Sequence, residues 1–573
     1  MTASLHNMIT YAGQLVLLCL ASSSSLLAQQ SPQLEHRWVY LSSNFQAEAE
    51  PERSIAIVRR AKKAGYNGIL LTDYKFSVLH KVVDRYFKNV AEFKRVADEC
   101  EMEIIPAVAP FGYSNGILAH DPNLAEAIPV QELPLTVENG EPQLPKPTEL
   151  YLANGGFEQA TGDVAAMWGF QDEPGKASLI DKQVKHSGNQ SLRFENLGKT
   201  NAPHGNGRIS KKLKLTPWRQ YHASVWIRTQ DLICDEVRVT AIGNGRTLVH
   251  SSLGVKPTQE WTQHHVVFNS LDLTEAQFYC GVWGGKNGTI WFDDVLFEEV
   301  AFLNLVRRDD CPLTIMSSDG ERFEEGLDFE SLVDPNLGNN PWLGEFDVYH
   351  QPPKLRLTPN SRIKNGMRLR ASYYHTLTIH EGQVACSLDH PDVFRVLKKQ
   401  VAGVEKLFQP KTYMLSHDEI RIANWGEAGR LGRRTAGQLL AQNVQQTVRV
   451  IHEIRPNARF CIWSDMFDPY HNAVKGPYYL VNGPLEGSWE GLPKGTTIIN
   501  WNSGKPEESL PFFDKLGHTQ ILAGYYDGDP KSIADWLKKA KGIKSVRGVM
   551  YTTWTNNYEH LESFAKSAWQ AQP

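Results

Sequence analysis

Blocks of consecutive apolar residues alternate with helix-like stretches near both ends of the chain. Residues 37–45, 68–74 and 103–111 are three such blocks, and apolar residues at helical spacing fill the intervals between them. The same alternation returns after residue 410, with blocks at residues 413–415, 459–466, 496–501, 519–527 and 546–554. Strands that are apolar throughout are typical of parallel βα units, which are buried on both faces. We therefore predict an α/β protein in which both ends of the chain form one (β/α)8 TIM barrel.

The middle of the chain has a different pattern. Between residues 148 and 300, short stretches alternate apolar and polar residues, and turn residues separate them. This pattern favours an inserted antiparallel β-sandwich of jelly-roll type. We expect residues 29–147 and 367–573 to form the barrel and residues 301–366, rich in Pro, Gly and Asp, to form a connector. A ninth candidate strand at residues 367–376 exceeds the eight that a barrel needs, so it is either extra or pairs with the third strand.

The N-terminus is typical of an export signal. Residues 15–21 form an apolar segment too short to cross a bilayer, and a small-residue cleavage motif follows at residues 26–29. We expect residues 1–28 to be a signal peptide and the mature protein to be secreted or periplasmic. The net charge of -4 gives no sign of nucleic acid or of an anionic membrane as a partner.

Polar or aromatic residues follow nearly every predicted barrel strand. The carboxyl ends of the eight strands of a TIM barrel meet on one face, and active sites lie there. The residues that should converge on this face are Asn44, Asp73, His417, Asp418, Glu419, Trp463, Asp465, Trp501, Asn502, Tyr525, Tyr526, Asp527 and Trp554. A doubly wound sheet would gather its site from fewer strands.

The densest polar group follows the block at residues 413–415. It contains His417, Asp418, Glu419 and Arg421. Two adjacent carboxylates at the end of a buried strand repel each other, which raises the pKa of one of them and suits a general acid working near neutral pH. A loop with solvated ion pairs is the alternative for an isolated Asp-Glu pair, but the converging strand ends favour a functional site.

The order of motifs in the middle of the chain resembles the jelly-roll carbohydrate-binding modules. The resemblance is carried by NGGFE at residues 154–158, HSGNQSLR at 186–193 and WFDD at 291–294. It implies that Glu158 and Asp293 help to hold a structural calcium, for which hard carboxylate oxygens are suitable ligands. The segment either binds sugar, with Trp168 and Trp283 as candidate contacts, or braces the barrel.

The barrel resembles the family 20 glycoside hydrolases, in which a helix ends in a turn before a strand that carries an Asp-Glu pair. The specific part of the resemblance runs from Leu388-Asp-His-Pro391 through a helix ending at Phe408 to the pair at 418–419. Looser similarities are Thr72, Asp73, Trp463, Asp465, Trp501, Tyr526, Asp527 and Trp554.

The resemblance implies a division of roles in the site. In that family the Asp positions the 2-acetamido group of the substrate, whose oxygen is the nucleophile, and the Glu is the general acid/base. Carried over, Asp418 would orient the substrate or stabilise the intermediate, and Glu419 would protonate the leaving oxygen. Tyr526 would hydrogen-bond the acetamido oxygen, and the tryptophans would wall the sugar.

Three departures from the family pattern indicate a different sugar or cleavage inside a chain. Ser416 and His417 replace two glycines, the arginine of the family's first strand is missing from residues 38–45, and Thr555 and Asn556 replace a glutamate after the last tryptophan. His417 and Arg421 could therefore meet an acidic or sulfated sugar, since an arginine fork suits planar anions, or they could orient the two carboxyl groups.

We predict a glycoside hydrolase that acts on a polysaccharide or glycan, with Glu419 as general acid/base and no cofactor for catalysis. An acid of raised pKa, an ionised neighbour and an aromatic-walled mouth suit an oxocarbenium-like transition state. Adjacent strand residues point to opposite sides, so Asp418 and Glu419 are not expected to face each other across a substrate. One alternative is a conventional two-carboxylate mechanism that uses Asp465 or Asp527. Another is a sugar-binding protein without catalysis.

Overall fold

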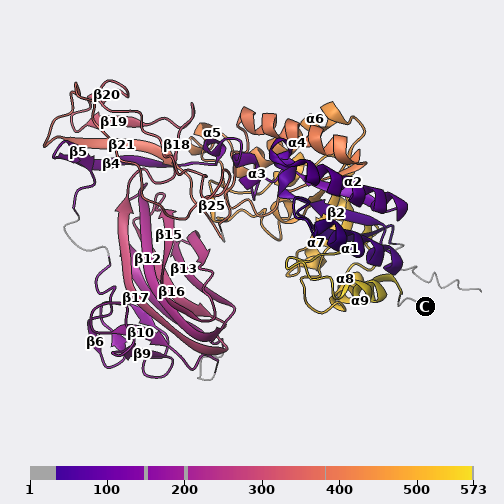
Figure 1. Cartoon of the computed structure of the whole chain (residues 1–573), viewed down its shortest axis with the longest axis horizontal. Helices are drawn as coiled ribbons and strands as arrows, with labels where there is room; N and C mark the ends of the chain where they lie inside the picture. The colour runs from indigo at the N-terminus through magenta and orange to yellow at the C-terminus, as the bar shows by residue number, and fades with distance from the viewer. Residues whose placement is uncertain (1–33, 147–151, 199–203, 381, 571–573) are drawn as a thin grey trace, which may run out of the picture.

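The computed structural model describes residues 34–146, 152–198, 204–380 and 382–570. The predicted signal peptide, residues 1–28, lies outside these ranges, so secretion stays a prediction. Within the described ranges, no helix is long and apolar enough to cross a membrane. Figure 1 shows a helix-covered barrel on the right and two bodies of β-structure on the left.

Both ends of the chain build one closed barrel of parallel strands in the order β1-β2-β3-β22-β24-β26-β27-β28. The strands are β1 (His36–Ser42), β2 (Gly68–Thr72), β3 (Glu103–Val108), β22 (Thr412–Leu415), β24 (Arg459–Trp463), β26 (Thr497–Asn500), β27 (Thr519–Leu522) and β28 (Val546–Tyr551). Strand β28 pairs with β1 and closes the barrel. Fully buried side chains such as Leu70, Ile105, Met414 and Ile499 fill its interior. The predicted TIM barrel is confirmed.

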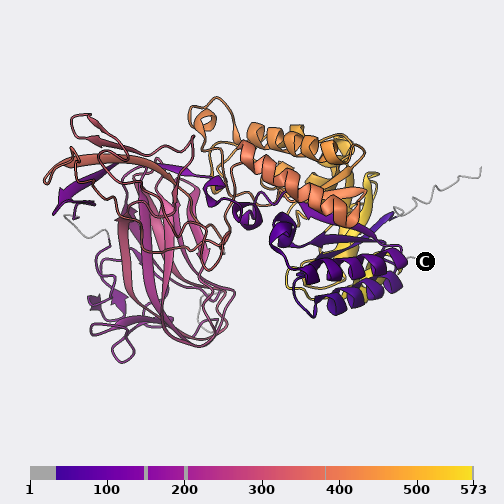
Figure 2. The ribbon, with the colours of Figure 1, turned by 45° about the horizontal axis from the view of Figure 1, so that its top comes forward.

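Helices cover the outside of the barrel and bury one apolar face against its strands (Figure 2). They are α1 (Glu50–Ala64), α2 (Asp84–Glu99), α4 (Pro391–Phe408), α6 (Ala436–Ile454), α7 (Pro506–Lys515), α8 (Ser532–Lys539) and α9 (Leu561–Ala565). Helix α6 begins at a capping box formed by Thr435 and Gln438, which satisfies N–H groups that a first helical turn leaves free. Helices α4 and α6 precede and follow β22, so they fix the strand that leads to the Asp-Glu pair.

The middle of the chain folds as two five-stranded antiparallel sheets, ordered β15-β12-β17-β10-β9 and β14-β13-β16-β11-β8. The strands are β8 (Phe170–Gln171), β9 (Ser178–Asp181), β10 (Ser191–Phe194), β11 (Gly207–Lys214), β12 (Gln220–Ile233), β13 (Glu236–Gly243), β14 (Arg246–Ser252), β15 (Gln259–Asn269), β16 (Glu275–Trp283) and β17 (Asn287–Val300). Phe194, Phe268, Phe278 and Phe292 are buried in their shared core. The predicted antiparallel sandwich is confirmed. Apolar and polar residues alternate along its strands, because one face of each strand turns inward to the shared core.

A further antiparallel sheet, which no sequence pattern predicted, has the order β20-β19-β21-β4-β5, with β18 beside β21. Its strands are β4 (Ile128–Glu138), β5 (Glu141–Gln143), β18 (Leu305–Val306), β19 (Thr314–Ser317), β20 (Arg322–Phe323) and β21 (Arg368–His375). We expected β4 and β21 to belong to the barrel and β18 to β20 to lie in a connector. Buried residues alternate with more exposed ones along residues 132–138 of β4, which suits a sheet with one solvated face. Strand β21 is therefore the extra strand.

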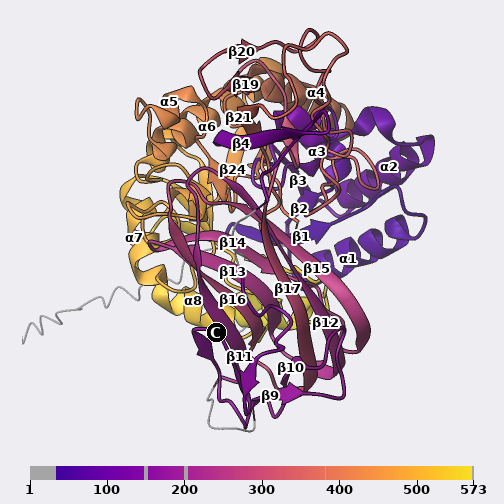
Figure 3. The same ribbon diagram turned by 90° about the vertical axis from the view of Figure 1, so that its left-hand side faces the viewer.

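The inserted bodies stand beside the face of the barrel that carries the carboxyl ends of its strands (Figure 1, Figure 3). The insertion begins after β3 and ends before α4, so it occupies a loop of that face. The Trp218 ring of the sandwich packs edge-on against Trp425, which follows β22, at 5.9 Å. The side-chain amides of Gln220 and Asn269 each lie 3.0 Å from a ring nitrogen of His375 on β21. These contacts fix the sandwich close to the loop that carries the Asp-Glu pair.

Candidate active site

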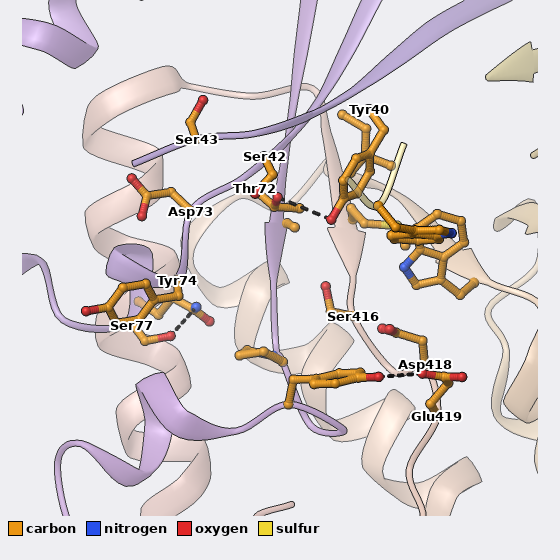
Figure 4. Close-up of a pocket in the computed structure, with 18 of the residues that line it drawn as sticks. Tyr40, Ser42, Ser43, Thr72, Asp73, Tyr74, Ser77, Ser416, Asp418 and Glu419 are labelled. Atoms are coloured by element: carbon orange, nitrogen blue, oxygen red, sulfur yellow. Dashed lines mark hydrogen bonds between the residues drawn. The ribbon is translucent and has the colours of Figure 1, made fainter. Parts of the chain in front are cut away.

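A cavity of about 670 Å³ opens where the carboxyl ends of the barrel strands meet. Among its lining residues are Tyr40, Asp73, Tyr74, Tyr113, Asp418, Glu419, Trp463, Trp501 and Trp554, which come from β1, β2, β3, β22, β24, β26 and β28 or from the loops after them. Figure 4 shows Asp73 and Tyr74 on one side of this cavity and Asp418 and Glu419 on the other. The strand ends thus converge as barrel topology predicts.

The residues singled out from the sequence divide into two groups. Those that line the cavity are Asp73, Asp418, Glu419, Trp463, Trp501 and Trp554. Those absent from the lining are Asn44, His417, Arg421, Asp465, Asn502, Tyr525, Tyr526 and Asp527, and each of them contacts another residue of the loops around the cavity or of the core behind it.

Asp418 and Glu419 both line the cavity because they lie beyond the end of β22 at Leu415. Glu419 has a φ of 49°, a left-handed conformation that is strained for a residue with a side chain. The Glu419 N–H donates to Asp465 Oδ2 at 2.9 Å, and Gln383 Nε2 donates to the Glu419 carbonyl at 2.8 Å. Strand alternation does not apply in this loop, and both residues line the same cavity. That the two carboxyl groups do not face each other across a substrate stays a prediction.

The Glu419 carboxylate is held by two donors. Arg421 Nη2 lies 2.8 Å from Glu419 Oε1, and the Tyr113 hydroxyl donates to Glu419 Oε2 at 2.5 Å. Arg421 is buried, donates to Gln383 Oε1 at 2.5 Å and lies over the Tyr479 ring. Arg421 therefore orients Glu419, which is the second of the two roles considered for it.

Asp418 carries the raised pKa that the sequence predicts for one member of the pair. Burial raises the pKa of Asp418 to about 8, and the neighbouring carboxylates of Asp465 and Glu419 add to the rise. A pKa of about 8 favours the protonated form of the Asp418 carboxyl group at pH 7. Both oxygens of Glu419 accept hydrogen bonds, one from Arg421 and one from Tyr113. One cavity thus presents two adjacent carboxyl groups in different surroundings.

Asp465 lies behind the pair and is fully buried. Its Oδ1 accepts from Trp501 Nε1 at 3.3 Å, and its Oδ2 accepts from Asn472 Nδ2 at 3.0 Å and from the Glu419 N–H. Burial raises the pKa of Asp465 to about 6. With its oxygens engaged by these donors and no surface on the cavity, Asp465 positions Glu419 and Trp501.

His417 points into the core between β22 and α6. Its Nε2 lies 2.8 Å from Asn443 Oδ1, and its ring packs against Phe111 at 4.8 Å between centroids. Burial lowers the pKa of His417 to about 4, so the ring is neutral at pH 7. This placement gives His417 a structural role in the described structure and no contact with the cavity.

Aromatic side chains form one wall of the cavity. The Trp554 ring lies 5.3 Å from Tyr40 and 5.7 Å from Trp463, measured between centroids. Asp527 Oδ2 accepts from the Trp554 N–H at 2.8 Å and so fixes the loop that carries this ring. The Tyr526 hydroxyl donates to the Trp501 carbonyl, next to the same wall. Flat apolar rings of this kind suit the faces of sugar rings.

Asp73 lines the cavity, and its carboxylate accepts hydrogen bonds from backbone N–H groups. Its carboxylate accepts from the N–H of Phe45 at 3.2 Å and from the N–H of Lys75 at 3.0 Å. Burial raises the pKa of Asp73 to about 6. Asp73 therefore shapes the loops after β1 and β2 on the side opposite the Asp-Glu pair.

Two residues that sequence reasoning missed, Tyr113 and Gln383, contact Glu419. Tyr113 follows β3, so the rule that selected polar and aromatic residues at strand ends could have found it. Gln383 lies in the segment that returns from the insertion, and its amide donates to the carbonyls of both Gly112 and Glu419 at 2.8 Å. No periodicity or motif in the sequence marks Gln383.

Glu158 and Asp293, the expected calcium ligands, hold the turn at residues 186–190. Glu158 Oε1 accepts from the Asn189 N–H at 2.8 Å, and Asp293 Oδ2 accepts from the His186 N–H at 2.8 Å. Among the residues that the structure describes, no group of three or more His, Cys, Asp or Glu side chains could hold a metal ion. These N–H donors account for both carboxylates without a cation, and the structural calcium stays a prediction.

The two tryptophans considered as sugar contacts of the sandwich are engaged within it. Trp168 Nε1 donates to the Asn154 carbonyl at 3.1 Å, and its ring stacks on Phe157. The Arg238 guanidinium covers the Trp283 ring at 3.9 Å from its centroid. These contacts favour packing roles for Trp168 and Trp283.

A glycine next to the Asp-Glu pair provides a test of how tightly this loop is packed. A Cβ on Gly112 would lie 2.0 Å from the Asp418 carbonyl oxygen, so Gly112→Ala must displace the backbone of Asp418. We expect a loss of about 1–3 kcal/mol in the free energy of unfolding. Gly476→Ala is the matched control, because its Cβ meets no atom within 4 Å. Equal melting temperatures of the two variants would contradict the packing described here.

Comparisons with known proteins find no matching family model and no matching curated protein. The carbohydrate-binding module TmCBM61, solved in complex with beta-1,4-galactotriose, is 19% identical and covers 27% of this chain and 100% of its own, with a TM-score of 0.20. A family 16 carbohydrate-binding module is 16% identical and covers 26% and 100%, also with a TM-score of 0.20. A rhamnosidase from Novosphingobium sp. PP1Y is 10% identical and covers 93% and 58%, with a TM-score of 0.33. Likenesses this distant carry no argument about activity.

Proposed function

We propose that this chain is a glycoside hydrolase whose two working carboxyl groups are Asp418 and Glu419. The observation that carries the proposal is the pair itself. Two adjacent carboxyl groups line one cavity on the carboxyl face of a TIM barrel, burial raises the pKa of Asp418, and Arg421 pairs with Glu419. Cleavage of a glycosidic bond needs a proton for the leaving oxygen and a negative group near the developing oxocarbenium ion. The aromatic wall of Tyr40, Trp463 and Trp554 supports a sugar as the substrate.

The protonation states suggest how the two groups divide the work. Asp418 gives its proton to the glycosidic oxygen as the bond from that oxygen to the anomeric carbon breaks. The Glu419 carboxylate stabilises the positive charge that develops on the sugar ring. Water then adds to the anomeric carbon, and its proton returns to Asp418, which restores the starting state.

The likeness to family 20 hydrolases offers the reverse assignment, with Glu419 as general acid/base and Asp418 orienting an acetamido group. That version requires the substrate to displace Arg421 or Tyr113 from Glu419, since both donate to its oxygens in the free protein. It also requires the Tyr526 hydroxyl to leave the Trp501 carbonyl before it can reach an acetamido oxygen. The free structure supports Asp418 as the proton donor.

The pH dependence of the activity follows from the charges around Asp418. A general acid is lost when it deprotonates, so we expect kcat/KM to fall as pH rises through about 8, the pKa of Asp418. Asp465→Asn removes a negative neighbour that raises this pKa, so its alkaline limb should shift to lower pH. Glu48→Gln, which removes an exposed carboxyl group outside the cavity lining, is the control. An alkaline limb that stays in place or moves to higher pH in Asp465→Asn would contradict the assignment.

A further inference from the structure

A second hollow of about 370 Å³ borders the cavity at the Asp-Glu pair. The two share the lining residues Tyr74, Ser77, Pro110 and Tyr113, and we call the place where these residues lie between them the passage. The remaining lining of the second hollow is Asn115, Gly116, Glu345, Gly382 and Gln383. A ligand that fills the first cavity therefore lies next to the second hollow.

We propose that the second hollow is a subsite for the neighbouring sugar unit of an uncharged glycan chain. The inference rests on the proposed function, because it places the reacting sugar beside Asp418 and Glu419. Glu345 belongs to the segment between β20 and β21, outside the barrel, so the inserted region supplies part of this subsite. The substrate is then an oligosaccharide or polysaccharide whose chain runs from the barrel toward the insertion.

Two tyrosines at the passage offer flat surfaces to a sugar ring. Tyr74 is 57% exposed and Tyr113 is 43% exposed, so both rings have free surface that a ligand can cover. The Lys75 ammonium lies over one Tyr74 ring face, 4.3 Å from its centroid, and fixes the ring. Tyr113 is fixed by its hydrogen bond to Glu419. Ordered and exposed rings of this kind lose little conformational entropy when a sugar stacks on them.

Polar groups in the second hollow suit sugar hydroxyls. Asn115 Nδ2 donates to the Gly344 carbonyl at 2.8 Å and lies 3.4 Å from Glu345 Oε2, so the segment that carries Glu345 is held against α3 (Asn115–Leu118). The Glu345 carboxylate keeps oxygen lone pairs that can accept hydrogen bonds from hydroxyl groups. A fixed acceptor beside an exposed ring is the combination that a sugar with an apolar face and equatorial hydroxyls requires.

The charges of the two hollows disfavour an anionic glycan. Their lining includes the carboxyl groups of Asp73, Glu419 and Glu345, and the described lining residues contain no Lys, Arg or His, although the Lys75 ammonium lies over the Tyr74 ring. The Arg421 guanidinium, once considered for an acidic sugar, is taken by Glu419 and Gln383. Sulfated or uronic units would meet like charges in a partly enclosed space, so an uncharged chain is the substrate class that fits.

The test compares long and short substrates of the same sugar. We use 4-nitrophenyl N-acetyl-β-glucosaminide with tetraacetylchitotetraose, and 4-nitrophenyl β-galactoside with β-1,4-galactotetraose. For Tyr74→Ala, the ratio of kcat/KM on the tetrasaccharide to kcat/KM on the nitrophenyl glycoside should fall about tenfold. Glu345→Gln should lower the same ratio by about threefold. Tyr74→Phe keeps the ring and should keep the ratio, as should Phe87→Ala, an exposed aromatic on α2.

The possible outcomes distinguish failure of the proposed subsite from failure of the proposed hydrolase activity. Equal losses on both substrates in Tyr74→Ala would overturn the subsite and leave the hydrolase in place. If the wild type cleaves no probe, calorimetric binding of the tetrasaccharides replaces turnover, and a tenfold weaker Kd in Tyr74→Ala would support the subsite while the proposed function fails. Absence of binding by both neutral tetrasaccharides, or preference for tetragalacturonate over them, would overturn the inference.

Discussion

Asp418→Asn should lower kcat by about 10²–10⁴-fold, because asparagine cannot give a proton to the leaving oxygen. The change keeps the shape of the side chain and its place in the cavity beside Glu419. A nitrophenyl glycoside with a very acidic leaving group needs less protonation, so its loss should be smaller than that of a natural glycan. Equal losses on both leaving groups would remove Asp418 from the role of proton donor.

The same variant makes a prediction about stability that does not depend on activity. The pKa of Asp418 is about 8 in the folded protein against an ordinary value of 3.8, so the folded state binds a proton that the unfolded chain releases. Stability therefore falls as pH rises from about 4 to about 8. The asparagine side chain of the variant does not titrate, so Asp418→Asn should gain stability over the wild type across this range, and the gain should grow toward pH 8.

Melting temperatures of both proteins between pH 5 and pH 8.5 check this second effect. The difference between Asp418→Asn and wild type should become more positive as pH rises. Glu48→Gln, which removes an exposed carboxyl group, should show a difference that stays constant. A difference for Asp418→Asn that does not change with pH would mean that Asp418 does not hold a proton in the folded state.

Glu419→Gln should lower kcat by about 10²–10⁴-fold while fold and sugar binding persist. The amide keeps an oxygen for one of the two donors, Arg421 or Tyr113, but removes the negative charge near the sugar. Tyr113→Phe is the comparison, because it removes one hydrogen bond and leaves the charge, so its loss should be closer to tenfold.

Near-normal turnover in Glu419→Gln would contradict the proposed role of the Glu419 carboxylate in stabilising the charge on the sugar ring. Circular dichroism and the melting temperature serve as controls, since Glu419 lies in a strained loop whose collapse would also abolish activity. Arg421→Met would leave Glu419 without its cation and should lower kcat less than Glu419→Gln does.

The barrel and the sandwich could be predicted from local patterns, because each is built mostly from segments that are close in sequence. Apolar blocks alternate with helices in the barrel, and alternating residues mark the sandwich. The third sheet could not be predicted, because β4 pairs with β21 across an insertion of more than two hundred residues. Its strands are short or irregular, and no local signal tells them from a connector or a barrel strand.

The candidate site was predictable at the level of topology and less so at the level of side chains. Strand ends had to converge, and Asp418, Glu419 and Trp463 do line the cavity. Which carboxyl group has the raised pKa depends on burial and on the distance to Asp465, and the sequence predicts neither. The sequence predicts His417 in the site because it precedes Asp418 and Glu419, but its ring points into the core.

Hydrolysis in water labelled with ¹⁸O tests the central claim most directly. The neutral oligosaccharide probes are incubated with the wild type or with the double variant Asp418→Asn, Glu419→Gln. The masses of the products are then measured by mass spectrometry. The account predicts that the wild type releases shorter sugars, each new reducing end carrying one ¹⁸O atom, and that the folded double variant releases none. Product release by both proteins at equal rates, or by neither with any neutral glycan, would contradict it.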